Sequence, residues 1–99
     1  MEKLERKSLQ DDYLQSLIAK QQATAVFEHR EVDLCRTLKA NRLNLSEKIE
    51  AARANGMDAG TVIKIGQFAT AARAMDRARE AYYAICDQRM AEAFKEACE

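Results

Sequence analysis

The chain of 99 residues has no proline, no tryptophan, three glycines and one histidine. Aromatic residues make up only 6% of it, which leaves few large side chains to anchor a binding surface. The formal net charge is +0, because 16 lysines and arginines balance 16 acidic residues. No overall field would therefore draw the chain to nucleic acid or to an acidic membrane surface, and only local charged patches could do so.

Signals for export and membrane insertion are missing as well. No apolar run approaches the roughly 20 residues that a helix needs to cross a bilayer. The first residues, "MEKLERKSLQDD", are charged throughout and do not resemble a signal peptide. The sequence therefore predicts a cytoplasmic protein with no membrane partner.

The cysteines do not suggest a disulfide framework. Cys35, Cys86 and Cys98 are odd in number and form no C-x-x-C pair. We expect Cys35 and Cys86 to pack as small hydrophobic residues, and Cys98, next to the chain end, to be exposed.

The residues that are abundant favour helices. Hydrophobic residues make up 47% of the chain and charged residues 32%, and alanine dominates the former. All three glycines lie in "ANGMDAGTVIKIG", residues 54–66, and apolar residues recur at helical spacing on both sides of it. We predict a single all-α domain of two long antiparallel helices, with the first over residues 8–55, a turn over 55–60 and the second over 59–98.

The ends of these helices have recognisable signals. Asn55 and Gly56 supply a helix stop, and Asp58 or Thr61 can cap the start of the second helix. A break in the first helix would fall between Asn41 and Ser46, since Asn41, Asn44 and Ser46 are poor helix-interior residues. We expect the helix to continue through it, because without glycine or proline the cost is a few tenths of a kcal/mol per residue.

A single bend at Met57 sets the register of the two helices. It brings apolar residues together near the bend and places Phe27 opposite Cys86. Midway along the pair it predicts a polar contact of Glu31 with Arg79 or Tyr82, of the kind that fixes register in coiled coils.

A second stripe on the predicted second helix suggests an interface. It consists mainly of small residues, which let another helix approach closely, and the proposed partner-binding residues are Ala71, Ala74, Ala78, Tyr82 and Ile85. The simpler interpretation is that alanine is the best helix former. We predict that the hairpin completes a four-helix bundle, by forming a homodimer or by binding a partner's helix.

No catalytic, metal or cofactor site can be assembled from the sequence. The sole histidine, His29, has no second histidine to complete a metal site, and Val26 stands where the acid of an E-x-x-H motif would be. The glycines fit neither a phosphate loop nor a dinucleotide fingerprint. We therefore predict that the chain is not an enzyme and holds no cofactor or metal.

Three functions are compatible with these features. The first is a non-enzymatic protein–protein interaction module, a small adaptor or regulator. The second is a chaperone or stalk-like component of an export system: in outline, a short helical hairpin with alanine-rich seams resembles the coiled-coil chaperones and stalk proteins of type III and flagellar export. It also resembles small phage and plasmid regulators that block a host protein, and both resemblances imply binding to another protein. The third is nucleic-acid binding through Lys64, Arg73, Arg77 and Arg79, which the low aromatic content makes the weakest.

Overall fold

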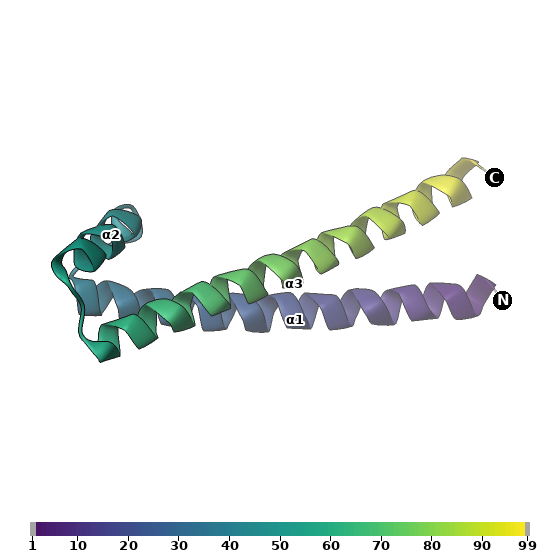
Figure 1. Cartoon of the computed structure of the whole chain (residues 1–99). Helices are drawn as coiled ribbons and strands as arrows, with labels where there is room; N and C mark the ends of the chain where they lie inside the picture. The colour runs from purple at the N-terminus through teal and green to yellow at the C-terminus, as the bar shows by residue number, and fades with distance from the viewer. Residues whose placement is uncertain (1, 99) are drawn as a thin grey trace.

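The computed structural model describes the backbone of residues 2–98 and the side chains of residues 8–98. Over these residues it contains three helices and no strands: α1 spans Glu2–Leu38, α2 spans Leu45–Asn55 and α3 spans Ala59–Cys98. The long helices α1 and α3 pack side by side with both chain ends at the same end of the rod, and α2 lies at the other end (Figure 1). The molecule measures 63 × 20 × 16 Å. The all-α fold and the antiparallel pair of long helices are thus confirmed.

The prediction of one continuous helix over residues 8–55 is wrong, because the chain breaks between Leu38 and Leu45. At the end of α1, Lys39 takes a left-handed conformation with φ of 53°. The Ala40 N–H then donates to the Cys35 carbonyl at 2.9 Å, which is the hydrogen bond of a Schellman motif. The helix also begins at Glu2, six residues before the predicted start.

The side chains of two asparagines stabilise the loop between α1 and α2. The Asn44 side-chain oxygen accepts a hydrogen bond from the Asn41 N–H at 2.8 Å. The Asn41 side-chain oxygen accepts from the N–H groups of Leu43 at 2.9 Å and Asn44 at 3.1 Å. These bonds satisfy backbone donors that a helix would otherwise pair, so the two side chains stabilise the loop in place of helix.

The turn into α3 follows the sequence signals. Gly56 ends α2 with φ of 81°, a backbone conformation that residues with a side chain rarely adopt. Asp58 caps α3, since its side-chain oxygen accepts a hydrogen bond from the Thr61 N–H at 2.8 Å. Hydrogen bonding to the Thr61 side chain, followed by the bond to the Thr61 N–H, lowers the pKa of the Asp58 carboxyl below its usual value. The bounds of α3 match the range predicted for the second helix.

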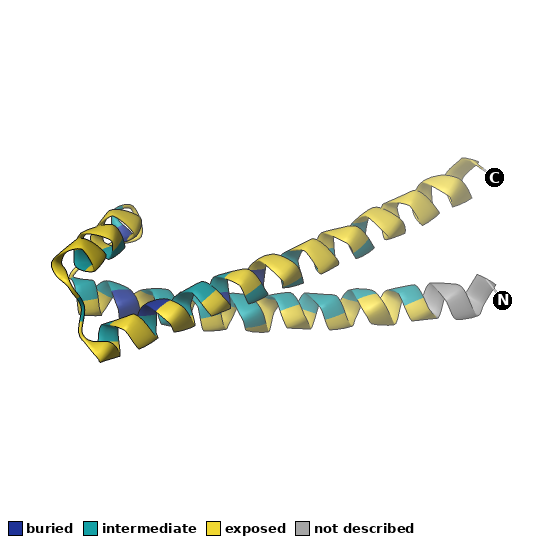
Figure 2. Ribbon diagram, viewed as in Figure 1, coloured by how far each residue is buried: buried dark blue, intermediate teal, exposed yellow. Residues whose placement is uncertain are grey.

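The buried core is small and lies near the end of the rod that carries α2 (Figure 2). Leu34 of α1 is completely buried, and Leu45 of α2 and Ile65 of α3 pack with it. Around these three lie partly buried residues from all parts of the hairpin: Cys35, Leu38, Ala40, Ile49, Met57 and Phe68. The core therefore ties the three helices together at one end.

Candidate interaction surface

The register of α1 against α3 differs from the one that a single bend predicts. Phe27 faces Phe68 with ring centroids 5.3 Å apart, whereas the single bend placed Phe27 opposite Cys86. Arg30 Nη1 donates to Gln67 Oε1 at 3.2 Å in the same region. The partner of Phe27 has moved by 18 residues, or about five helical turns. The cause is α2, which folds back as part of the connection, so that α1 is the helix that packs along the length of α3.

This shift removes the predicted contact of Glu31 with Arg79 or Tyr82. Glu31 pairs with Arg42 of the loop instead, with Oε1 and Nε 2.8 Å apart. Tyr82 lies against Tyr13 of α1, with ring centroids 5.7 Å apart. The register is thus marked by aromatic contacts and not by the polar contact inferred from the sequence.

The predicted partner-binding stripe is mostly turned into the hairpin itself. Ala71 is buried, and Ala74, Ala78, Tyr82 and Ile85 are half-buried. Since α1 is the helix that packs along α3, these small residues let α1 approach closely. The stripe that the sequence predicted as a contact for another chain's helix therefore lies partly covered within the hairpin.

An aromatic cluster lies between α1 and α3 in the half of the rod that is far from α2. We call the end of that half, where the two helices separate, the open end. Tyr82 stacks with Tyr13 and makes an edge contact with Tyr83, with centroids 5.5 Å apart. Two cations cover it: Lys20 Nζ lies 4.7 Å from the Tyr82 ring and Arg89 lies 3.9 Å from the Tyr13 ring. Hydrogen bonding to Tyr13, followed by bonding to Cys86, raises the pKa of the Tyr82 hydroxyl. The Tyr82 hydroxyl therefore stays protonated near physiological pH.

Beyond this cluster, α3 diverges from α1 (Figure 1) and all of its residues from 87 to 98 are exposed (Figure 2). Three large apolar side chains share one face of this segment: Tyr83, Met90 and Phe94 are 55%, 71% and 73% exposed. At 100° per residue they lie within about 40° of one another around the helix axis. We call them the α3 end face.

A second exposed apolar face runs along α1. Leu14, Ile18 and Val32 are 47%, 53% and 45% exposed, and Ala25 between them is also exposed. These four residues lie within about 40° around the helix axis. Phe27, which contacts α3, lies on the opposite side of α1. We call the four residues the α1 outer face.

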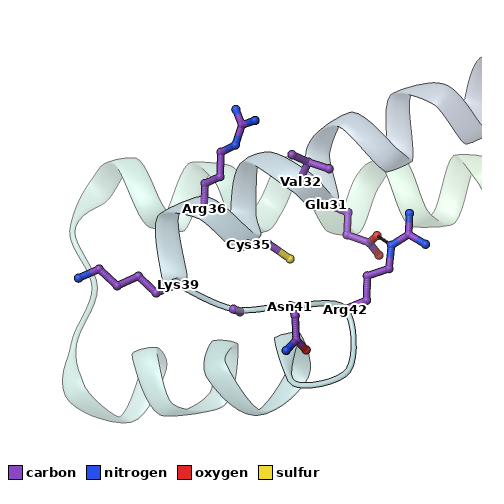
Figure 3. A pocket seen from close by; sticks show the side chains of 8 residues that line it. Glu31, Val32, Cys35, Arg36, Lys39, Asn41 and Arg42 are labelled. Atoms are coloured by element: carbon purple, nitrogen blue, oxygen red, sulfur yellow. Dashed lines mark ion pairs between the residues drawn. The ribbon is translucent and has the colours of Figure 1, made fainter.

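A shallow cavity of about 510 Å³ lies where α1 meets the loop. Its lining combines apolar, cationic and thiol groups: Glu31, Val32, Cys35, Arg36, Lys39, Ala40, Asn41 and Arg42. Figure 3 shows the Glu31–Arg42 ion pair spanning one side and the Cys35 sulfur pointing toward the loop. Burial, with a smaller contribution from Glu31, raises the pKa of the Cys35 thiol. This thiol is therefore a poor nucleophile.

The other candidate residues are scattered. His29 is exposed on α1, and the described residues contain no group of three His, Cys, Asp or Glu side chains placed to hold a metal ion. Cys35 and Cys86 are half-buried, Cys98 is exposed, and all three are free. Of the basic residues considered for nucleic acid, Lys64 contacts Asp33 at 3.5 Å and Thr37 at 3.0 Å. Internal contacts thus occupy part of the basic surface.

The fold and the exposed faces define a helical hairpin with apolar surface outside its own seam. No protein-family model matches the chain, and no curated protein or solved structure matches it significantly. Along the part of the chain that the structure describes, none of the helices combines the length and the apolar character that crossing a membrane requires.

Proposed function

We propose that the chain is a non-enzymatic protein–protein interaction module whose hairpin self-associates to complete a four-helix bundle. The observation that carries this proposal is the pair of exposed apolar faces. The α1 outer face and the α3 end face together expose Leu, Ile, Val, Met, Phe and Tyr side chains at regular helical spacing. Isolated exposed apolar residues are ordinary, but contiguous ones on one face of a helix are typical of interaction sites.

The small core supports the same proposal. Leu34 is the one completely buried large side chain among the described residues, and the open half of the rod has no buried residue beyond Met75 on α3. A chain of this size buries a modest part of its surface when it folds alone. Docking a second pair of helices would cover apolar surface that the hairpin leaves in water, and closed two-fold dimers are the commonest assembly.

A second candidate is a helper that holds a helix of another protein, as the export chaperones do. The observation that favours it is the divergence of α1 and α3, which leaves Met90 and Phe94 more than 70% exposed at an open end. Such a helper would stay monomeric alone and gain order when it binds an amphipathic helix.

Solution mass tests the proposed function. Sedimentation or light scattering from about 10 µM to 1 mM, with reducing agent to keep Cys98 from forming disulfides, should show a dimer. Phe94→Asp and Ile18→Asp probe the two faces, and Gln88→Asp places the same charge at an exposed polar site on α3. A mass that stays monomeric at every concentration contradicts self-association and leaves the helper function. That function predicts that adding an amphipathic helical peptide raises the helicity or the thermal stability of the chain.

A further inference from the structure

The geometry points to the α1 outer face as the dimer contact, with a second copy of the chain docked antiparallel on it about a two-fold axis near residue 23. This inference rests on the proposed function and specifies its surface and partner. Three observations lead to it: the spacing of the apolar residues, the opposite charges at the two ends of the face, and the position of the loop cavity.

The spacing is that of a coiled-coil seam. Ile18, Ala25 and Val32 repeat every seven residues, as the a positions of a coiled coil do, and Leu14, four residues before Ile18, takes a d position. In an antiparallel pair, a positions of one helix meet d positions of the other. With the axis near residue 23, Leu14 of each copy lies against Val32 of the other, and the apolar ends of the face cover one another.

The charges favour the antiparallel arrangement over the parallel one. An exposed acid, Asp11, stands at the Leu14 end of the face. Exposed bases, Arg36 and Lys39, stand at the Val32 end. An antiparallel copy brings the acid of one chain beside the bases of the other at both ends, whereas a parallel copy would place like charges together.

The cavity lies at the basic end of the face. Val32 and Arg36 line it and point to the side of α1 away from α2 (Figure 3), and both are exposed. A second copy that places Leu14 against Val32 would bring Asp11 to this basic cavity edge. The two ends of the surface are thus complementary to one another in charge, as a two-fold contact requires.

The centre of the α1 outer face is less apolar than its ends, so it would contribute less to the affinity of the dimer. At the d positions between Leu14 and Cys35, the sequence has Gln21 and Glu28, so Ile18 of one copy would meet Glu28 of the other. An acid in an apolar seam costs affinity. Replacing it, as in Glu28→Leu, should therefore tighten the dimer by about tenfold or more, and this change does not depend on damaging the fold.

Dimerisation constants of the full chain and its variants test the inference by sedimentation equilibrium. Ile18→Asp should weaken the dimer at least tenfold, because it puts a second acid beside Glu28 of the other copy. Val26→Asp is the matched control, since Val26 is 51% exposed on the same helix but lies about 80° around it from Ile18. It should leave the constant within about twofold. Circular dichroism would establish that both variants keep their helices.

Charge reversal tests the direction of the helices. Asp11→Arg and Arg36→Asp should each weaken the dimer by roughly tenfold, and the double variant should restore it, because the reversed charges again face opposite partners. A double variant as weak as the single ones would overturn the antiparallel contact. A dimer that Phe94→Asp disrupts and Ile18→Asp leaves intact would overturn this inference while the proposed function stands. A chain that is monomeric up to about 1 mM would overturn both.

Discussion

Two glycine-to-alanine substitutions should change stability in opposite directions. Gly66 lies inside α3, and a Cβ added there would meet no atom within 4 Å. Alanine is about 0.8–1.0 kcal/mol more favourable than glycine in a helix interior. With no steric conflict, Gly66→Ala should stabilise the fold by nearly that amount, which for a domain of this size raises Tm by roughly 4–8 °C.

Gly56→Ala has equally open surroundings but a different backbone. A Cβ there also meets no atom within 4 Å, yet the φ of 81° is one that an alanine rarely adopts. Keeping the turn with alanine at position 56 would cost about 1–2 kcal/mol. The Tm of Gly56→Ala should therefore fall by at least as many degrees as the Tm of Gly66→Ala rises. Because space is equal at the two sites, backbone conformation alone separates the two results.

Thermal unfolding followed by circular dichroism at 222 nm, at one fixed concentration, gives both values. The fixed concentration matters because self-association would make Tm depend on it. If Gly56→Ala proves neutral or stabilising, the turn does not have the backbone described above. If Gly66→Ala destabilises, something must pack against that side of α3, and a second copy on that side would contradict the placement of the dimer contact on α1.

Three further results follow from the core, the break and the cap. Leu34→Ala should lower the free energy of unfolding by about 2–4 kcal/mol in urea titrations, since Leu34 is completely buried; a loss below about 1 kcal/mol would show that this core is not tightly packed. Lys39→Gly should raise Tm by a few degrees, because glycine adopts the φ of 53° without cost, and an unchanged or lower Tm would argue against the Schellman end of α1. The folded-state pKa of Asp58 is depressed, so its contribution is present above the unfolded pKa of about 3.9 and is lost as pH falls through the folded pKa. Wild-type Tm should therefore fall more steeply than that of Asp58→Asn as pH is lowered below about 4, and parallel curves would count against the cap.

The sequence predicted those features of the fold that depend on local signals. The helical period, the glycine stop at Gly56 and the Asp58 cap are each set by residues within one or two turns, and the structure places them accordingly. The break at residues 39–44 depends on more than propensity. Asn41 and Asn44 were recognised as poor helix formers, but their reciprocal hydrogen bonds, which stabilise the loop, exist only once the chain has already turned.

The candidate interaction surface could not be predicted for the same reason. Both long helices carry apolar residues on more than one face, and only the register decides which face meets the other helix. One unexpected turn moved the partner of Phe27 by about five helical turns, enclosed Ala71 and left the α1 outer face uncovered. A small error in the predicted connection between two helices thus changes which residues are assigned to the helix–helix contact and which are assigned to the exposed surface. The fold of such a hairpin is robust to that error, but the assignment of its binding residues is not.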